Sequence, residues 1–154
     1  MRDDWDPEFF PRLLPASRVS LGAASVLCRI ARKAARDVGV AVSVVVVDGG
    51  GAIVMAERMD NAGTLSLEVA AAKARSSALS GGPTVAIEAL VETDSQGLAT
   101  VAGLVAVGGG VPLRYADALV GAIGISGATP MQDHEIAVGA TAALGEILLP
   151  ATSD

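Results

Sequence analysis

The feature that most constrains the fold is the β-branched run at residues 40–48, which reads VAVSVVVVD. Valine favours strands because its branched side chain packs well on a pleated surface. A strand that is apolar at nearly every position is typical of a sheet covered on both faces. Three glycines at residues 49–51 form a tight turn, and residues 52–59 return as a second strand. We therefore predict a β-hairpin between two protein layers.

Helical patterns surround this hairpin. Apolar residues recur at helical spacing in three segments that have start or stop signals at their ends, and a short helix is expected between the second and the third. The last of them begins with Thr129-Pro130-Met131-Gln132, a capping sequence with proline in the first turn. The predicted helices span residues 18–38 (capped by Ser17), 65–79 (capped by Thr64), 84–90 and 130–149.

Three more strands are predicted at residues 103–107, 111–115 and 118–126. Pro112 places the second of these at a sheet edge or at a strand start, because proline cannot donate a ladder hydrogen bond. The short connections between strands favour antiparallel pairing. The element order predicts an α+β, profilin-like fold, in which an antiparallel five-stranded sheet is flanked by helices and the two long terminal helices share one face.

The amino-acid composition restricts the kinds of molecule that the chain can bind. The chain has 154 residues, enough for one domain, which we place at residues 17–150. Hydrophobic residues make up 51%, more than a monomer of this size needs to bury, so we expect a homo-oligomer. Aromatic residues are only 3% and the net charge is −6, which argues against a nucleic-acid partner. The longest uncharged stretch, residues 97–113, is short for a membrane span and is interrupted by glycines.

The first 16 residues form a separate acidic arm. Pro7, Pro11 and Pro15 exclude one continuous helix there, and Trp5, Phe9 and Phe10 are all but one of the aromatic residues of the chain. The arm is either a disordered tail or a segment that docks on the domain or on a neighbouring subunit, and the burial of three large rings favours docking. The arm lacks the pattern of a secretory leader, so we expect a cytoplasmic protein.

Two sequence blocks are more specific than an ordinary helix or strand pattern. The first contains VVVVDGGGAIVMAERMDNAG and AAAKARSSA within residues 44–78, and the second is GGGVPLRYADALVGAIGISGATPMQDHEIA at residues 108–137. In order and spacing they resemble the GlcG/HbpS-like family. The resemblance implies an antiparallel sheet flanked by helices and assembly into dimers up to octamers. It also implies heme as a ligand of some members, and a relationship to the C-terminal domain of a corrinoid adenosyltransferase.

Arg58, Met59 and Asp60 follow the second predicted strand. Strand ends hold side chains rigidly, so Arg58 can act as an anion clamp with Asp60 as a base or orienting group. A surface ion pair is the alternative. Lys73 lies in an alanine-rich helix. It is either a solvated lysine or an inward-facing partner of Asp60 that takes part in acid–base chemistry.

The second block supplies further candidates. Gly109, Gly110 and Pro112 either present backbone N–H groups to a ligand carboxylate or form a hairpin that needs positive φ. Asp133 lies in the first turn of the last helix, where it either favours the helix dipole or contributes to a site. His134 is the only histidine. It is a candidate axial heme ligand or proton shuttle, and an exposed helical histidine is the alternative.

These residues predict no ordinary metal site, because one histidine and one cysteine far apart cannot bind zinc in the usual way. The resemblance favours a small-ligand-binding protein that takes heme or a related tetrapyrrole, with His134, Met59, Cys28 and Tyr115 as candidate ligands. The alternative is a cofactor-free enzyme of isomerase, cyclase or lyase type, acting on a small organic substrate in an intersubunit pocket. A purely structural oligomer is the third interpretation. The enzyme hypothesis requires Arg58, Asp60 and Lys73 to meet near Asp133.

Overall fold

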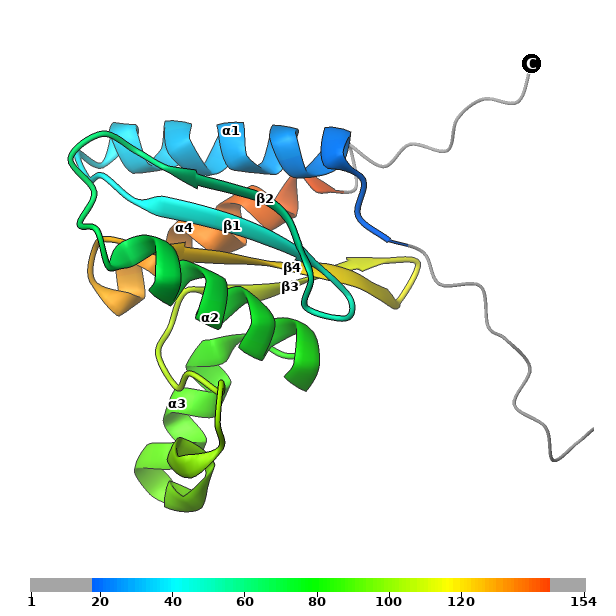
Figure 1. The fold of residues 1–154 in the computed structure, drawn as a ribbon, viewed down its shortest axis with the longest axis vertical. Helices are drawn as coiled ribbons and strands as arrows, with labels where there is room; N and C mark the ends of the chain where they lie inside the picture. Colours follow the sequence, from blue (N-terminus) through cyan, green and yellow to red (C-terminus); the bar gives the residue numbers. More distant parts are fainter. Residues whose placement is uncertain (1–17, 145–154) are drawn as a thin grey trace, which may run out of the picture.

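The computed structural model describes residues 18–144, so the predicted arm at residues 1–16 lies outside the described residues. Helices and strands follow one another as shown in Figure 1. In chain order they are α1 (Leu21–Asp37), β1 (Ser43–Asp48), β2 (Ile53–Arg58), α2 (Ser66–Ser80), α3 (Thr84–Thr93), the 3-10 helix η1 (Gln96–Thr100), β3 (Gly110–Tyr115), β4 (Ala118–Ser126) and α4 (Pro130–Ala142).

The strands form one antiparallel sheet in the order β2-β1-β4-β3. The predicted hairpin is β1–β2, and the last predicted strand agrees with β4 at both ends. Ser43 opposes Arg58 on one side and Ser126 on the other. The segments that follow β2 and β4 therefore leave the sheet at the same end.

The described part of the chain has four strands, so the predicted fifth strand at residues 103–107 is wrong. The backbone in this region bonds to side chains instead of a neighbouring strand. Val105 N donates to Ser76 Oγ at 2.8 Å, and Gly108 N donates to Glu88 Oε2 at 2.9 Å. Since α2 and α3 supply these acceptors, the segment follows the helices as a loop.

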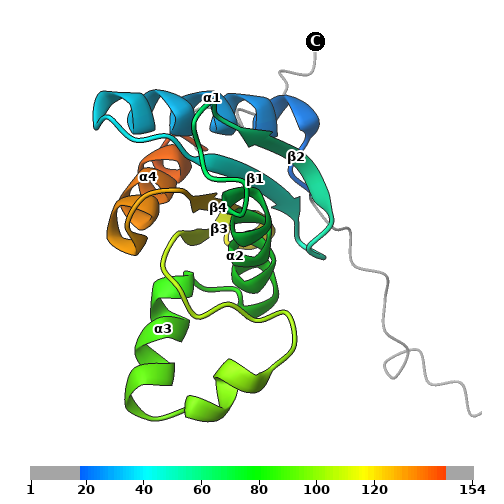
Figure 2. The ribbon, with the colours of Figure 1, turned by 60° about the vertical axis from the view of Figure 1, so that its left-hand side comes forward.

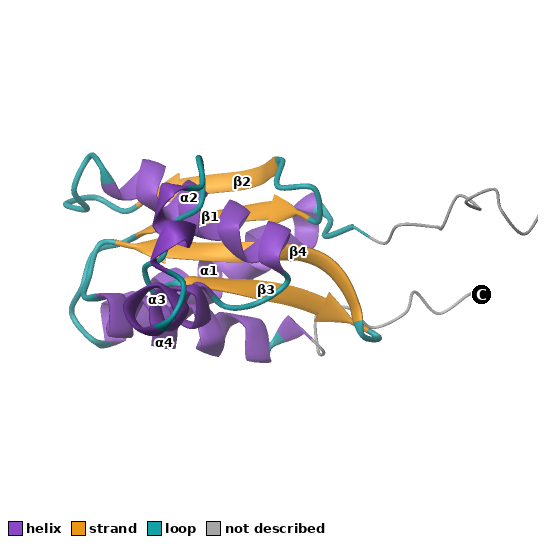
Figure 3. Cartoon of the chain, turned by 90° about the horizontal axis from the view of Figure 1, so that it is seen from below, coloured by secondary structure: helices purple, strands orange, loops and turns teal. Residues whose placement is uncertain are grey.

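The two faces of the sheet are covered by different helices, as Figure 3 shows from below. Side chains alternate across a strand, so Val44 and Val46 pack with α1 and α4, while Val45 and Val47 pack against α2. This confirms the predicted two-sided burial of the valine run. The terminal helices α1 and α4 share one face, as predicted.

Close packing of α2 on the sheet depends on small residues. Ala70, Ala74 and Ala78 of α2 are buried. A side chain at Gly124 of β4 would overlap the carbonyl oxygen of Ala70. Beyond α2, the segment containing α3 and η1 projects away from the sheet, which Figure 2 shows clearly.

Two of the predicted helix caps are wrong. α1 is capped by Ser20, whose Oγ accepts from Ala23 N at 3.2 Å, and not by Ser17. α2 begins after Leu65 without a side-chain cap, so the predicted Thr64 cap is wrong. Thr129 and Gln132 form the predicted capping box of α4. No helix among residues 18–144 is long and apolar enough to cross a membrane.

Candidate functional site

A buried ion pair connects α2 to the start of α4. The Nζ atom of Lys73 lies 2.8 Å from Oδ2 of Asp133, and each side chain is 2% exposed. Lys73 Nζ also donates to the carbonyl oxygen of Ile125 at 3.0 Å. Oδ1 of Asp133 accepts a hydrogen bond from Ala128 N at 3.0 Å. Both charges are therefore compensated by protein groups, as burial requires.

The glycine-rich segment before β3 packs directly on this pair. Gly109 has φ +127°, and a Cβ there would lie 2.9 Å from Lys73 Nζ and 2.5 Å from the carbonyl oxygen of Ile125. At Gly110 a Cβ would overlap the backbone of Lys73. Gly110 N donates to Thr84 Oγ1 at 2.8 Å. This N–H therefore bonds within the protein, and the close packing explains why glycine occupies both positions.

This geometry corrects the predicted surroundings of Lys73. The lysine is neither solvated nor paired with Asp60, since it points inward and pairs with Asp133. The ammonium and the carboxylate have their partners within the fold and almost no contact with solvent. The pair therefore fixes the position of the α4 start relative to α2 and β4.

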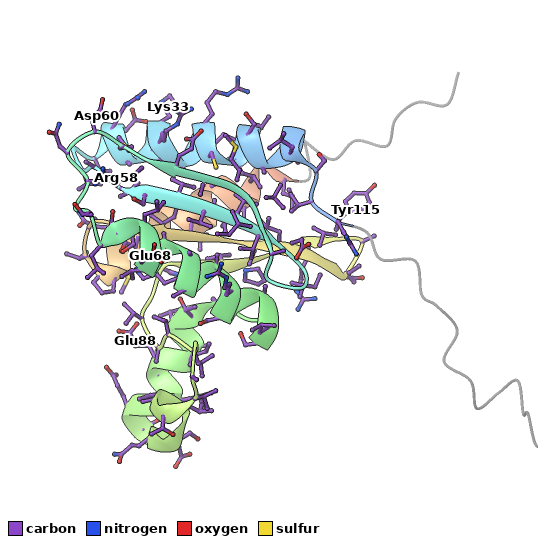
Figure 4. All side chains as sticks on the ribbon, in the orientation of Figure 1. Lys33, Arg58, Asp60, Glu68, Glu88 and Tyr115 are labelled. Carbon is purple, nitrogen blue, oxygen red and sulfur yellow. The ribbon has the colours of Figure 1, made fainter. Side chains whose placement is uncertain are left out.

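Arg58, Met59 and Asp60 line a different site, a polar hollow of about 570 Å³ beside α1. The other lining residues are Arg32, Arg36 and Glu57. Figure 4 shows Arg58 and Asp60 at the end of β2 near α1, away from Glu88 on α3. The predicted single pocket, in which Arg58, Asp60 and Lys73 meet near Asp133, is therefore not formed by the described residues.

This first hollow is rich in arginine. Nε of Arg32 lies 2.9 Å from Oε2 of Glu57, and NH1 of Arg58 donates weakly to Thr64 Oγ1 at 3.4 Å. Guanidinium groups present planar forks of N–H donors that suit carboxylates and phosphates. Arg32 and Arg36 were not predicted as site residues, because in the sequence they belong to a helix face that normally faces water.

A second hollow of about 400 Å³ lies between α3 and the start of α4. Its walls are mostly apolar, and His134 contributes an imidazole ring. The lining residues are Val85, Glu88, Ala89 and Glu92 from α3, Gly108 from the preceding loop, and Thr129, Pro130, Met131 and His134 from the α4 end.

His134 is the one predicted site residue that lines this second hollow. Its Nδ1 atom is buried and has no hydrogen-bond partner among the described residues. Glu88, on the opposite wall, is held by its hydrogen bond from Gly108 N. Met131 and Glu88 were not predicted. Met131 precedes His134 by three residues on α4, whereas Glu88 of α3 comes to the same hollow only through the fold.

The remaining candidates lie outside both hollows. Pro112 is partly buried within β3, next to buried Val111 and Leu113. Tyr115 is 39% exposed at the β3–β4 turn, and Figure 4 shows it at the end of the molecule opposite Arg58.

Cys28 is fully buried, and burial together with the Glu57 charge raises the pKa of its thiol to about 12, with Arg32 opposing the shift. A protonated thiol is a poor iron ligand. Among the described residues no group of three His, Cys, Asp or Glu side chains is arranged to hold a metal ion.

The fold and these hollows define a class: an α+β domain with four antiparallel strands flanked by helices, which presents concave sites suited to small molecules. Residues 19–142 match the family described as "Haem degrading protein HbpS-like". The chain belongs to this HbpS-like family.

Solved structures agree with the assignment. HbpS is 32% identical in sequence and superposes with a TM-score of 0.82, covering 86% of this chain and 94% of its own. A double mutant of Streptomyces reticuli HbpS is 31% identical and has the same TM-score, covering 86% of this chain and 91% of its own. The Klebsiella pneumoniae protein ORFY is 28% identical over 89% of this chain and 97% of its own, also at 0.82. PduOC, solved as a complex with heme, is 30% identical over 82% of this chain and 94% of its own, at 0.75. Comparison with curated protein sequences gave no match.

Proposed function

We propose that this protein binds heme or a related tetrapyrrole, and that the hollow between α3 and α4 is the binding site. The observation that carries the proposal is the imidazole of His134, which lies on a mostly apolar wall with Nδ1 buried and unpartnered. Membership of the HbpS-like family and similarity to PduOC, a protein solved with heme, support the same ligand class.

The residues of this hollow fit such a ligand. A tetrapyrrole ring needs apolar walls, which Val85, Ala89, Pro130 and Met131 provide. The volume of about 400 Å³ lies in the range of small-molecule sites, about 300–1,000 Å³. His134 is partly buried, and a histidine imidazole is a common ligand of heme iron.

His134 would hold the iron in this proposal, and Met131 would supply further contact to the ring. Glu88 and Glu92 carry the same charge as heme propionates, so this wall favours the apolar part of the ring system. When bound, heme would supply ligand-exchange and electron-transfer chemistry at its iron.

The enzyme alternative has no support among the described residues. Acid–base chemistry by Lys73 and Asp133 requires contact with a substrate, yet each side chain is 2% exposed and bonded within the protein. The ionisable residues of the two hollows are also separated, since Arg58 and Asp60 line one and His134 lines the other. We therefore favour binding, with assembly into a homo-oligomer as the excess of apolar residues indicates.

The test is a heme titration of the full chain followed by absorption spectroscopy. We expect a shifted Soret band that saturates at a fixed ratio of heme to chain, and a loss of affinity of at least tenfold in His134→Ala. Glu135→Ala is the matched control, because Glu135 is exposed on the same turn of α4 and does not line this hollow. Equal binding by wild type and His134→Ala would reject the site, and no Soret shift in the wild type would reject the ligand.

A further inference from the structure

The proposed heme site makes no use of the first hollow, which lies beside α1. This hollow has a volume of about 570 Å³ and is lined by Arg32 and Arg36 of α1 and by residues 57–60, which end β2 and enter the following turn. Arg32 and Arg36 are four residues apart, so they reach the hollow from one face of the helix. Three guanidinium groups and two carboxylates therefore line one concave site. The site has a net positive charge, although the chain as a whole has a net charge of −6.

One arginine of the hollow is already paired, but the other two are not. Arg32 forms the ion pair with Glu57 described above, and these two charges balance each other. Among residues 18–144, no acidic side chain lies within 4.0 Å of the Arg36 or Arg58 guanidinium group, and no basic side chain lies that close to the Asp60 carboxylate. All three of these side chains are exposed, so a molecule in solution can reach them. Two cations and one anion are therefore available to a ligand.

The turn after β2 determines where the Asp60 carboxylate lies. Ala62 N donates to the carbonyl oxygen of Met59 at 3.1 Å, which closes a turn with Asp60 and Asn61 at its centre. Asn61 has φ +68°, a left-handed conformation that asparagine tolerates better than most residues. Met59 N donates to the carbonyl oxygen of Val42 at 3.0 Å, which attaches the turn to the chain entering β1. The turn is therefore fixed at both ends, and Figure 4 shows Asp60 beside α1.

We propose that this hollow binds a small carboxylate that carries a hydroxyl group. A ligand carboxylate between Arg36 and Arg58 accepts hydrogen bonds from two planar forks of N–H donors, the geometry in which arginine binds carboxylates best. It also brings the combined charge of Arg36, Arg58 and Asp60 to zero, whereas a phosphate dianion leaves a negative excess beside Asp60. An ionised carboxylate such as that of Asp60 can only accept hydrogen bonds, so it suits a ligand hydroxyl group. The proposal is independent of heme binding, because the two hollows share no lining residue.

Three probes test the two chemical requirements of the ligand separately. Lactate has both the carboxylate and the hydroxyl group, propionate lacks the hydroxyl group, and lactamide lacks the charge. Ligand-observed NMR follows the methyl signal of each probe in titrations with the full chain at constant ionic strength, so that screening is the same throughout. We expect lactate to bind about fivefold more tightly than propionate, because of one added hydrogen bond, and lactamide to bind most weakly. Equal binding of lactate and either analogue, or tighter binding of inorganic phosphate than of lactate, would overturn the proposal.

A pair of arginine variants locates the binding in this hollow. Arg36→Gln removes one of the two donor forks and should weaken lactate binding about tenfold. Arg29→Gln is the matched control, because Arg29 is also exposed on α1 but does not line the hollow. Both variants remove one positive charge from the same helix, so general attraction of anions falls equally in the two. Equal losses of lactate affinity would therefore show that no specific site exists here.

Asp60→Ala tests the contact with the hydroxyl group. Loss of a negative charge should strengthen the binding of lactate and propionate alike, so the informative quantity is the ratio of the two affinities. This ratio should fall from about fivefold to about 1, because the acceptor for the lactate hydroxyl group is gone. A merely structural effect of the substitution changes both affinities together and leaves the ratio as it was. An unchanged ratio would overturn the role of Asp60 and the hydroxyl part of the proposal.

Discussion

Nζ of Lys73 and Oδ2 of Asp133 lie 2.8 Å apart although 60 residues separate them in sequence. The pair joins the middle of α2 to the first turn of α4, and Lys73 also bonds to the carbonyl oxygen of Ile125 at the end of β4. Three elements are therefore fixed at one point, next to the hollow that contains His134.

Removing one member of this pair should be costly. In Lys73→Met the Asp133 carboxylate stays buried and keeps only its hydrogen bond from Ala128 N. Breaking a buried pair in this way lowers the free energy of unfolding by about 3–5 kcal/mol. Urea denaturation followed by circular dichroism measures the change.

The exposed pair Lys33–Asp37 provides the control for this prediction. Its atoms are 2.7 Å apart, as close as the buried pair, but both side chains are mostly exposed. Lys33→Met should therefore change the free energy of unfolding by only about 0–1 kcal/mol. A similar small effect in Lys73→Met would show that the buried pair does not hold the fold together.

Two glycines should respond to alanine with opposite signs. At Gly109 the positive φ and the closeness of Ile125 O and Lys73 Nζ leave no room for a methyl group, so Gly109→Ala should destabilise the protein by more than about 1 kcal/mol. At Gly139, within α4, nothing lies within 4 Å of an added Cβ. Gly139→Ala should stabilise by up to about 1 kcal/mol, because alanine favours the helix. Thermal melts of both variants check the signs.

Much of the fold could be predicted because its signals are local. The valine run, the glycine turn and the Thr129 capping box each depend on neighbouring residues, and β1, β2 and α4 begin where these signals place them to within a few residues. The fifth strand was wrong because residues 103–107 have an apolar strand pattern, but their backbone bonds to the side chain of Ser76, a residue distant in sequence. A periodic pattern contains no information on such partners.

The candidate site was predictable only in its residue types. Lys73, Asp133 and His134 stood out in the sequence, but which of them would meet depends on how α2, α3 and α4 are placed around β3 and β4. The pairing of Lys73 with Asp133 instead of Asp60 follows from the Ala70 and Gly124 contact, which places α2 directly over β4. Met131 and Glu88 carry no local signal of their own.

The thiol of Cys28 should make the protein less stable in alkali. Burial is the main cause that raises its pKa from 9.0 to about 12. Between these values the unfolded chain loses the proton and the folded chain keeps it, so the unfolded state binds fewer protons. The free energy of unfolding should therefore be unaffected below pH 9 by this group and should fall as the pH rises from 9 toward 12.

Urea denaturation between pH 8 and 11 tests this dependence, with Cys28→Ala as the comparison. The cavity left by the variant lowers stability at every pH, so the informative quantity is the slope. Above pH 9 the slope should be shallower in Cys28→Ala than in the wild type, since other groups titrate equally in both. Parallel curves would show that the folded thiol ionises as freely as the unfolded one.

The capping box of α4 should couple helix stability to ligand binding. Thr129 Oγ1 accepts from Gln132 N at 3.3 Å, and Gln132 Oε1 accepts from Thr129 N at 3.2 Å. Thr129→Ala removes the first bond and should cost about 0.5–2 kcal/mol in the free energy of unfolding. Because the same turn positions Met131 and His134, the variant should also bind heme less tightly under conditions where it remains folded. Thr141→Ala, at the other end of α4, is the control and should leave the heme affinity unchanged. If the two variants bind heme equally, the start of α4 does not position the ligand.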